Sequence, residues 1–250
     1  MVSLLPNRPI ILGHRGASAH APENTMAAFQ HAIDCGADGI EFDVKLTRDK
    51  EIIIIHDLTV NRTTNGKGKV KELTLEKIRE LDAGSHFSEK FRGEKIPLLK
   101  DVLVKMPPSF IINIELTNYN SMFDGLAKKT ANLVKDLGKA KQVVFSSFNP
   151  LNLILTKRIL PETPVALLAL PGKAGALNRS RAMVKVAPKF INPNYRDVNA
   201  SFLKKQRDLN RSIITWTVND VEEIIRLFDL KIDGIISDDP QLVRKVFGVE

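Results

Sequence analysis

The chain has 250 residues, of which 43% are hydrophobic, so it is long enough to bury a sizeable core and short enough for one domain over residues 1–250. Its single cysteine, Cys35, excludes an internal disulfide, and no apolar run is long enough to span a membrane. The net charge of +8 is compatible with nucleic acid, an anionic membrane surface or an anionic small substrate. We interpret it as a solvated lysine-rich surface and expect no nucleic-acid partner, because the basic residues are scattered and few aromatic rings accompany them.

The N-terminal segment, residues 1–8, carries neither a charged leader nor a long apolar stretch. We therefore expect a cytoplasmic protein without stable membrane insertion.

Short apolar runs alternate along the chain with longer amphipathic stretches. This alternation is typical of parallel strands joined by right-handed helical crossovers. Eight such units in 250 residues predict a (β/α)8 TIM barrel, with a doubly wound open sheet as the alternative. The predicted strands are residues 10–12, 39–44, 110–116, 143–147, 165–170, 190–193, 213–218 and 234–237, and the predicted helices are 25–35, 98–106, 121–137, 150–160, 200–209 and 220–228, with a final helix after an Asp238 or Asp239 cap.

The segment from about residue 45 to 95 is too long for a loop between a strand and a helix. It contains a further predicted strand (51–56), a Gly-rich polar stretch around Asn65 and a predicted short helix (74–81). Long insertions inside compact domains tend to be functional, so we expect this segment to pack over one rim of the barrel.

Three acidic residues lie within predicted barrel strands. Glu41 and Asp43 are two residues apart and share one face of their strand, and Glu115 lies in the next barrel strand. Carboxylates that converge at one end of a barrel repel one another unless a cation lies between them. All-oxygen ligands suit a hard cation, so the sequence predicts a site for Mg²⁺ or Ca²⁺.

Two histidines directly follow apolar strands, His14 after the first strand and His56 after the inserted one. An imidazole titrates near neutrality, so both are candidates for general acid and base. Arg15 beside His14 suits a phosphate, because its planar fork donates two parallel hydrogen bonds. A metal, two histidines and an arginine indicate chemistry at phosphorus, although a carbonyl substrate also fits these residues. We interpret His20, His31 and His86 as bystanders.

At these positions the chain resembles the glycerophosphodiester phosphodiesterase family. The matching segments, which run almost from end to end, are "HRGASAHAPENT", "GADGIEFDVKLTRD", "IIIIHDLTVNRTTNGKGKV", "INIEL", "SSF", "TWTVN" and "DGIISDDP". The resemblance implies a TIM barrel with an insertion after the second strand. It also implies hydrolysis of small glycerophosphodiesters to glycerol 3-phosphate and an alcohol.

The resemblance further implies a role for each matching residue. The nucleophile is either the substrate's glycerol hydroxyl or water, and which histidine serves as acid or base stays open. The implied roles are the catalytic pair for His14 and His56, the ligands of one divalent cation for Glu41, Asp43 and Glu115, a phosphate contact for Arg15, support of the loop or site for Glu23 and Asn24, and the pocket wall for Phe148 and Trp216.

The chain departs from the family pattern at Thr117. Family members usually carry a lysine two residues after the third acid, whereas this chain reads Glu115-Leu116-Thr117. Either Arg15 and the metal hold the phosphate alone, or Lys45 substitutes, provided that its strand continues so far.

Two rival functions remain open. One is a lipid-directed phosphodiesterase of the lysophospholipase D kind, which requires an apolar access surface or a membrane anchor. The other is a non-catalytic barrel that binds phosphate-bearing ligands or nucleic acid through its positive charge. The loss of the lysine favours it slightly, whereas both histidines and all three carboxylates speak against it. The sequence leaves the alcohol and the choice between monomer and homodimer open.

Overall fold

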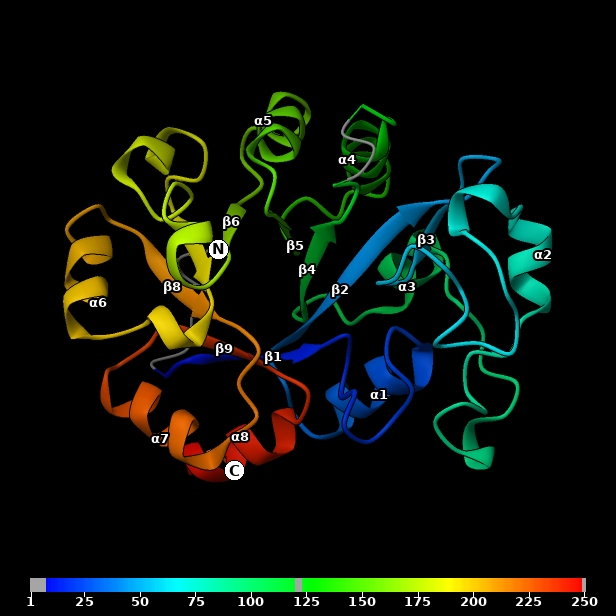
Figure 1. The fold of residues 1–250 in the computed structure, drawn as a ribbon, viewed down its shortest axis with the longest axis horizontal. Helices are drawn as coiled ribbons and strands as arrows, with labels where there is room; N and C mark the ends of the chain where they lie inside the picture. The colour runs from blue at the N-terminus through cyan, green and yellow to red at the C-terminus, as the bar shows by residue number, and fades with distance from the viewer. Residues whose placement is uncertain (1–7, 120–122, 249–250) are drawn as a thin grey trace.

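The computed structural model describes residues 8–119 and 123–248, and its ribbon is shown in Figure 1. The strands are β1 (Ile10–His14), β2 (Gly39–Leu46), β3 (Ile52–Ile54), β4 (Ile111–Leu116), β5 (Val143–Ser147), β6 (Val165–Ala169), β7 (Phe190–Pro193), β8 (Ser212–Thr215) and β9 (Gly234–Ser237). The α-helices are α1 (Met26–Asp34), α2 (Leu75–Glu80), α3 (Leu99–Lys105), α4 (Leu126–Asp136), α5 (Pro150–Ile159), α6 (Ala200–Arg207), α7 (Val221–Asp229) and α8 (Pro240–Phe247).

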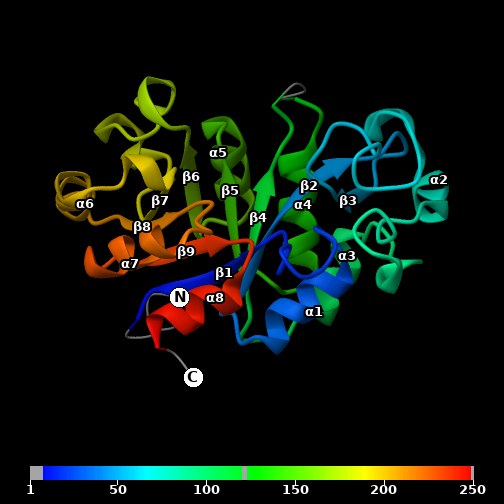
Figure 2. The ribbon, with the colours of Figure 1, turned by 60° about the horizontal axis from the view of Figure 1, so that its bottom comes forward.

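The strands form a closed barrel. Hydrogen bonding runs in the order β1-β9-β8-β7-β6-β5-β4-β2, and the parallel pairing of β1 with β2 closes the ring. Each of the eight strands predicted for the barrel overlaps one of these strands, so the TIM barrel is confirmed and the open sheet is excluded. In Figure 2 the carboxyl ends of β4, β5 and β6 point toward one rim, where the connecting loops gather.

The insertion forms a separate layer at that rim. Its strand β3 pairs antiparallel with the end of β2, where Leu46 lies opposite Ile52. A hydrophobic cluster that includes Ile53, Val60 and Ile78 fills its interior. The layer therefore has its own small core, and β3 holds it against the barrel.

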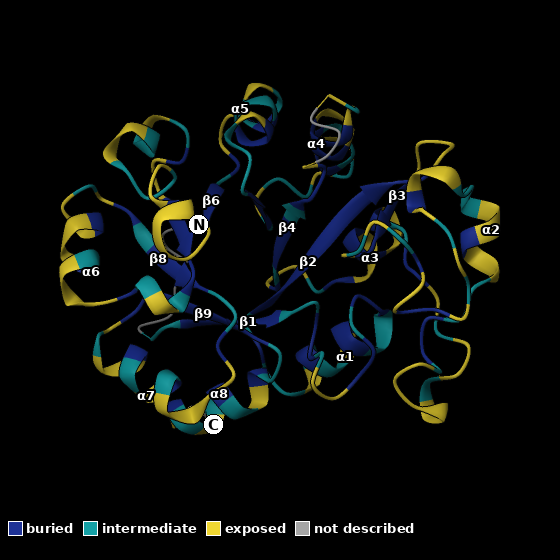
Figure 3. Ribbon diagram, in the orientation of Figure 1, coloured by how far each residue is buried: buried dark blue, intermediate teal, exposed yellow. Residues whose placement is uncertain are grey.

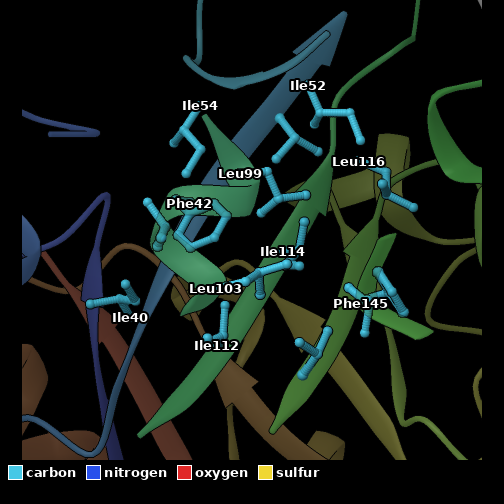
Figure 4. Packing of buried hydrophobic residues seen from close by; sticks show 14 of the residues in the cluster. Ile40, Phe42, Ile52, Ile54, Leu99, Leu103, Ile112, Ile114, Leu116 and Phe145 are labelled. Atoms are coloured by element: carbon cyan, nitrogen blue, oxygen red, sulfur yellow. The ribbon is translucent and has the colours of Figure 1, made fainter. Parts of the chain in front are cut away.

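The main core lies between the strands and the helices around them. Along β2, Ile40, Phe42 and Val44 are fully buried and belong to one cluster with side chains of β4 and with Leu99 and Leu103 of α3. Figure 4 shows Phe42 beside Leu99 and Leu103. Burial of each such side chain contributes about 1.5–3 kcal/mol, so these contacts fix which residues of β2 face away from the barrel interior. In Figure 3 the strands are buried and the helices expose their outer faces.

One predicted helix needs correction at its start. Helix α4 begins at Leu126 rather than at residue 121, because Gly125 precedes it with a φ of 91°; residues 120–122 lie outside the described part of the chain. The connection from β6 to β7, where no helix was predicted, holds two short 3₁₀ turns (Gly172–Gly175 and Arg181–Lys185). Pro171 and Gly172 at its start disfavour a regular helix there.

The connections carry local signals that the sequence makes visible. Thr25 caps α1, and Asp239 caps α8 just before Pro240 at its first position. In the described part of the chain, every helix is too short or too polar to cross a membrane.

Candidate active site

Strand alternation brings three carboxylates together at the carboxyl end of the barrel. Since the even-numbered residues of β2 pack outward, Glu41 and Asp43 face the interior, and parallel register places Asp43 opposite Glu115 of β4. One oxygen from each of these three residues lies within 4.8 Å of the others. Glu41 is 4% and Asp43 2% exposed, so neither can rely on water to offset the repulsion.

The electrostatics of this acidic cluster show a deficit of positive charge. Burial, and then repulsion from Asp43 and Glu115, raise the pKa of Glu41 well above its usual value. Burial and Asp43 raise the pKa of Glu115 to about 8, although the Tyr119 hydroxyl donates a hydrogen bond to it. Carboxylates in this state suit a hard divalent cation, which takes oxygen ligands and relieves their repulsion.

The loop after β1 places a histidine and an arginine beside the acidic cluster. Gly16 has a φ of 87°, and a side chain there would meet the backbone of Ala28 at 2.6 Å, so the tight turn requires glycine. Arg15 itself has a φ of 55°, an uncommon conformation that is found at functional sites. The Nε2 atom of His14 lies 4.0 Å from Oε2 of Glu41.

An aspartate orients His14 from the other end of the chain. The Nδ1 atom of His14 lies 2.6 Å from Oδ1 of Asp238, which also accepts a hydrogen bond from the Ser18 hydroxyl. Asn219 donates to the second oxygen of Asp238. Burial by itself raises the pKa of Asp238, but the hydrogen bonds from His14, Asn219 and Ser18 lower it overall. A fixed anion at Nδ1 leaves Nε2 as the nitrogen that faces the acidic cluster.

A second set of charged residues joins the insertion to the barrel. The Nδ1 atom of His56 lies 2.8 Å from Oδ1 of Asp57. Arg62 donates hydrogen bonds both to Asp57 and to Glu23. Although burial raises it, the pKa of Glu23 falls to about 2 because of Arg62 and Arg15, and the pKa of Asp57 is lowered chiefly by its hydrogen bond from Arg62. These pairs fix His56 relative to the loop after β1.

Arg15 lies between the two sets of acids. One terminal nitrogen donates to Glu23 at 2.8 Å, and Nε lies 3.4 Å from Oδ2 of Asp43. Burial lowers the pKa of Arg15, but Asp43, Glu23 and Glu41 outweigh burial and raise it overall. The buried Nε atom has no hydrogen-bond partner among the described residues, so a donor is available at this site.

Aromatic rings form the opposite wall of a cavity of about 140 Å³. Phe148 meets Trp216 edge to face with ring centres 5.5 Å apart, and the ring centre of Tyr119 lies 5.7 Å from that of Phe148. The lining of the cavity brings together His14, Arg15, Glu41, Asp43, His56, Glu115, Phe148 and Trp216, together with Leu168, Thr217 and Ile236.

Glu23 and Asn24 lie behind this cavity. Asn24 donates a hydrogen bond to Asp43 at 3.2 Å, and Glu23 contacts Arg15. Both therefore support residues of the cavity, and neither is part of its lining.

Lys45 and Thr117 form a direct contact just beyond the acidic cluster. Strand β2 continues to Leu46, so Lys45 shares the face of Glu41 and Asp43. Its amine, which is buried with the side chain 8% exposed, donates to the hydroxyl of Thr117 at 2.8 Å and to the Thr117 carbonyl at 3.1 Å. The amine of Lys45 thus lies at Thr117, the position at which the resemblance leads one to expect a lysine.

Sequence reasoning missed four residues of the site, Asp57, Asp238, Arg62 and Tyr119. The only available signals were the His-Asp pair at 56–57 and the Asp-Asp pair before Pro240, where one aspartate suffices to cap the helix. Arg62 and Tyr119 carried no such signal.

Comparison with known proteins identifies relatives over nearly the whole chain. The model of the glycerophosphoryl diester phosphodiesterase family matches residues 14–242. A glycerophosphodiester phosphodiesterase of Caldanaerobacter subterraneus subsp. tengcongensis is 37% identical over 243 residues, which cover 95% of this chain and 99% of the relative. Another, of Bacillus altitudinis, is 36% identical over 241 residues, which cover 94% and 97% of the two chains. The solved structure of an Oleispira antarctica phosphodiesterase has the same fold, with a TM-score of 0.88 at 24% identity over 99% of this chain and 98% of that one.

Proposed function

The chain belongs to the glycerophosphoryl diester phosphodiesterase family, and we propose that it hydrolyses small glycerophosphodiesters with one divalent cation and the pair His14 and His56. The observation that carries this proposal is the acidic cluster, with three carboxylate oxygens within 4.8 Å, beside two histidines that each contact an aspartate. The Oleispira antarctica phosphodiesterase was solved in complex with the product sn-glycerol-3-phosphate. This complex supports glycerol 3-phosphate as the product here.

Glu41, Asp43 and Glu115 would hold the cation, Mg²⁺ or Ca²⁺. A divalent cation at this place supplies Lewis acidity toward a phosphoryl oxygen and offsets the negative charge of the substrate. Arg15 would contact the phosphate through its guanidinium, whose Nε lies 3.4 Å from Asp43 and makes no hydrogen bond among the described residues. Lys45 adds a second positive charge on the same strand face as the acids. Arg15 and Lys45 would therefore position the phosphate beside the acidic cluster.

The two histidines carry the proton transfers. Since aspartates hold Nδ1 of both rings, the Nε2 atoms are the ones that exchange protons with substrate. One imidazole takes the proton of the attacking hydroxyl, and the other donates a proton to the leaving alcohol. The attacking hydroxyl belongs either to the glycerol moiety or to water. A cyclic phosphate intermediate, visible by phosphorus NMR during turnover, is expected only for the glycerol hydroxyl.

The barrel and the insertion at 45–95 act as one unit, because Arg62 and β3 join them. A cavity of about 140 Å³ suits a small molecule and supports no role for nucleic acid. We further propose a cytoplasmic monomer or homodimer.

A coupled assay for glycerol 3-phosphate tests the proposal. Purified protein is expected to release glycerol 3-phosphate from at least one glycerophosphodiester. This release is expected to stop after EDTA treatment and to resume when Mg²⁺ or Ca²⁺ is added. His14→Ala and His56→Ala are each expected to lower kcat by about 10²–10⁴-fold. His20→Ala, in the same loop as His14 but paired with Asp239, is the matched control. Release of no product with any metal contradicts the proposed function, and full activity of either histidine variant contradicts the acid–base roles.

A further inference from the structure

A second cavity, of about 220 Å³, lies next to the proposed active site on the side of the insertion. It is lined by the end of β2, the end of β4, the start of α4 and two segments of the insertion, all of them described parts of the chain. The lining residues are Lys45, Leu46, Leu58, Lys69, Val70, Lys71, Thr117, Asn118, Asp124 and Leu126.

The strand geometry relates this lysine-lined cavity to the acidic cluster. Lys45 follows Asp43 by two residues on β2, and Thr117 follows Glu115 by two residues, directly after the end of β4. Two residues along a strand span about 6.6 Å, so the lysine-lined cavity begins one side chain beyond the acids. The cavity of about 140 Å³ that Phe148 and Trp216 line lies against the acids themselves. It extends to the end of β5, to β6 and to the residues that follow β8. The two cavities therefore lie at neighbouring positions along β2 and β4, one at the acids and the other at Lys45 and Thr117.

The charges around the lysine-lined cavity are unequal. Its lining carries three ammonium groups, of Lys45, Lys69 and Lys71, and one carboxylate, of Asp124. Lys69 also pairs with Glu72, whereas Asp124 is engaged by the amide of Asn118 and the backbone of Leu126. The net positive charge attracts an anionic group and repels a cationic one.

We propose that the lysine-lined cavity receives the leaving alcohol and selects alcohols that carry an anionic group over simple cationic ones. This inference rests on the proposed function, because it assigns a place to the alcohol that hydrolysis releases. Over the whole reaction, water supplies the oxygen that joins phosphorus, either directly or by opening a cyclic phosphate. The bond from phosphorus to the alcohol oxygen breaks, and the alcohol leaves with a proton from a histidine. The apolar side chains of Leu46, Val70 and Leu126 would contact the carbon atoms of the alcohol.

Two substrates that differ by one carboxylate test the selection. The serine diester, sn-glycero-3-phosphoserine, differs from the ethanolamine diester, sn-glycero-3-phosphoethanolamine, only by one added carboxylate. We expect kcat/KM for the serine diester to exceed that for the ethanolamine diester by about threefold or more, since partly exposed charges a few ångströms apart interact weakly in water.

Charge variants at the cavity assign the effect to its lining. Lys71→Glu is expected to lower the serine-to-ethanolamine ratio by about threefold, and Asp124→Asn is expected to raise it. Lys67→Glu is the matched control, because Lys67 is an exposed lysine of the same segment and is not part of the cavity lining. It makes the same change in net charge and is expected to leave the ratio unaltered.

The possible outcomes separate the two proposals. A wild-type ratio at or below one overturns the selection for anionic alcohols, as does a Lys71→Glu ratio that matches that of Lys67→Glu. Release of glycerol 3-phosphate from neither diester, nor from any other glycerophosphodiester, contradicts the proposed function instead.

Discussion

The carboxylates around the proposed active site fall into two groups with opposite electrostatics. In the acidic cluster inside the barrel, burial and mutual repulsion raise the pKa values of Glu41 and Glu115. At the rim, Glu23 and Asp57 have lowered pKa values, because Arg62 and other cations pair with them. The rim acids are thus fixed anions that orient an arginine and a histidine. In the acidic cluster, Arg15 offsets the negative charge only in part, because the pKa values of Glu41 and Glu115 stay raised. A divalent cation would supply the missing positive charge.

Removal of one acid from the cluster has the largest expected effect on activity. Glu41→Gln is expected to lower kcat by more than about 100-fold and to weaken cation binding, because an amide oxygen replaces a charged ligand. It is also expected to raise the Tm of the metal-free protein, since it removes a buried repulsion. Calorimetric titration with Mg²⁺ and Ca²⁺, the coupled assay and thermal melts measure the three effects.

The control for this variant is Glu51→Gln, which changes an exposed acid beside β3. Unchanged cation affinity in Glu41→Gln would rule out the acidic cluster as the cation site.

Replacement of Lys45 has the next largest expected effect, because this lysine lies beside the acidic cluster. Lys45→Met is expected to lower kcat/KM by about tenfold to 100-fold, since loss of a charge-assisted contact costs about 1.5–3 kcal/mol. Moving the lysine to the other strand, with Lys45→Thr and Thr117→Lys together, is expected to restore part of the activity. Steady-state kinetics on one diester measure both changes. Wild-type kinetics in Lys45→Met would show that Arg15 and the cation hold the phosphate alone.

A substitution of Arg62 tests the two rim acids, Glu23 and Asp57, whose charges Arg62 offsets. Arg62→Ala removes the donors that hold Asp57 and Glu23, and is expected to lower kcat by about tenfold with little change in KM, because His56 and Arg15 lose their orientation. Arg62→Lys is expected to recover little, since one ammonium cannot replace the paired donors.

Arg92→Ala is the matched control for Arg62→Ala, because Arg92 is another arginine of the insertion and pairs only with the exposed Glu89 among the described residues. If both variants lose activity equally, the loss reflects the stability of the insertion rather than the orientation of the site.

The two groups of acids also differ in how far the sequence predicts them. The acidic cluster follows from a period of two residues along Glu41-Phe42-Asp43 and from the pairing of neighbouring strands, which are local rules. The same rules place Lys45 on the face of the acids once β2 continues to Leu46. The order of strands, and hence the barrel, follows from the same alternation of short apolar runs and helices.

The rim pairs follow from contacts between distant segments, which no local rule supplies. Arg62 meets Glu23 across 39 residues, and His14 meets Asp238 across 224. The Asp-Asp pair before Pro240 leaves open which residue caps α8, and only the folded chain shows that Asp239 caps it while Asp238 turns to His14. The start of α4 was predicted too early because a glycine with positive φ precedes the helix.

The pH dependence of stability has opposite signs for the two groups, and its expected size is a few degrees of Tm. Glu23, with a folded pKa of about 2 against 4.5, stabilises the fold above pH 4.5, and this contribution is lost as the pH falls toward 2. Glu115, with a folded pKa of about 8 against 4.5, binds a proton more tightly in the folded state, so its contribution is present below pH 4.5 and is lost as the pH rises toward 8.

In EDTA the Tm is therefore expected to fall between about pH 5 and pH 8. A saturating cation, which binds the deprotonated acids, is expected to flatten or reverse this fall. Glu115→Gln should remove part of the slope in EDTA, because Glu41, whose pKa is also raised, keeps its own contribution. Equal slopes with and without the cation would contradict the assignment of these acids as its ligands.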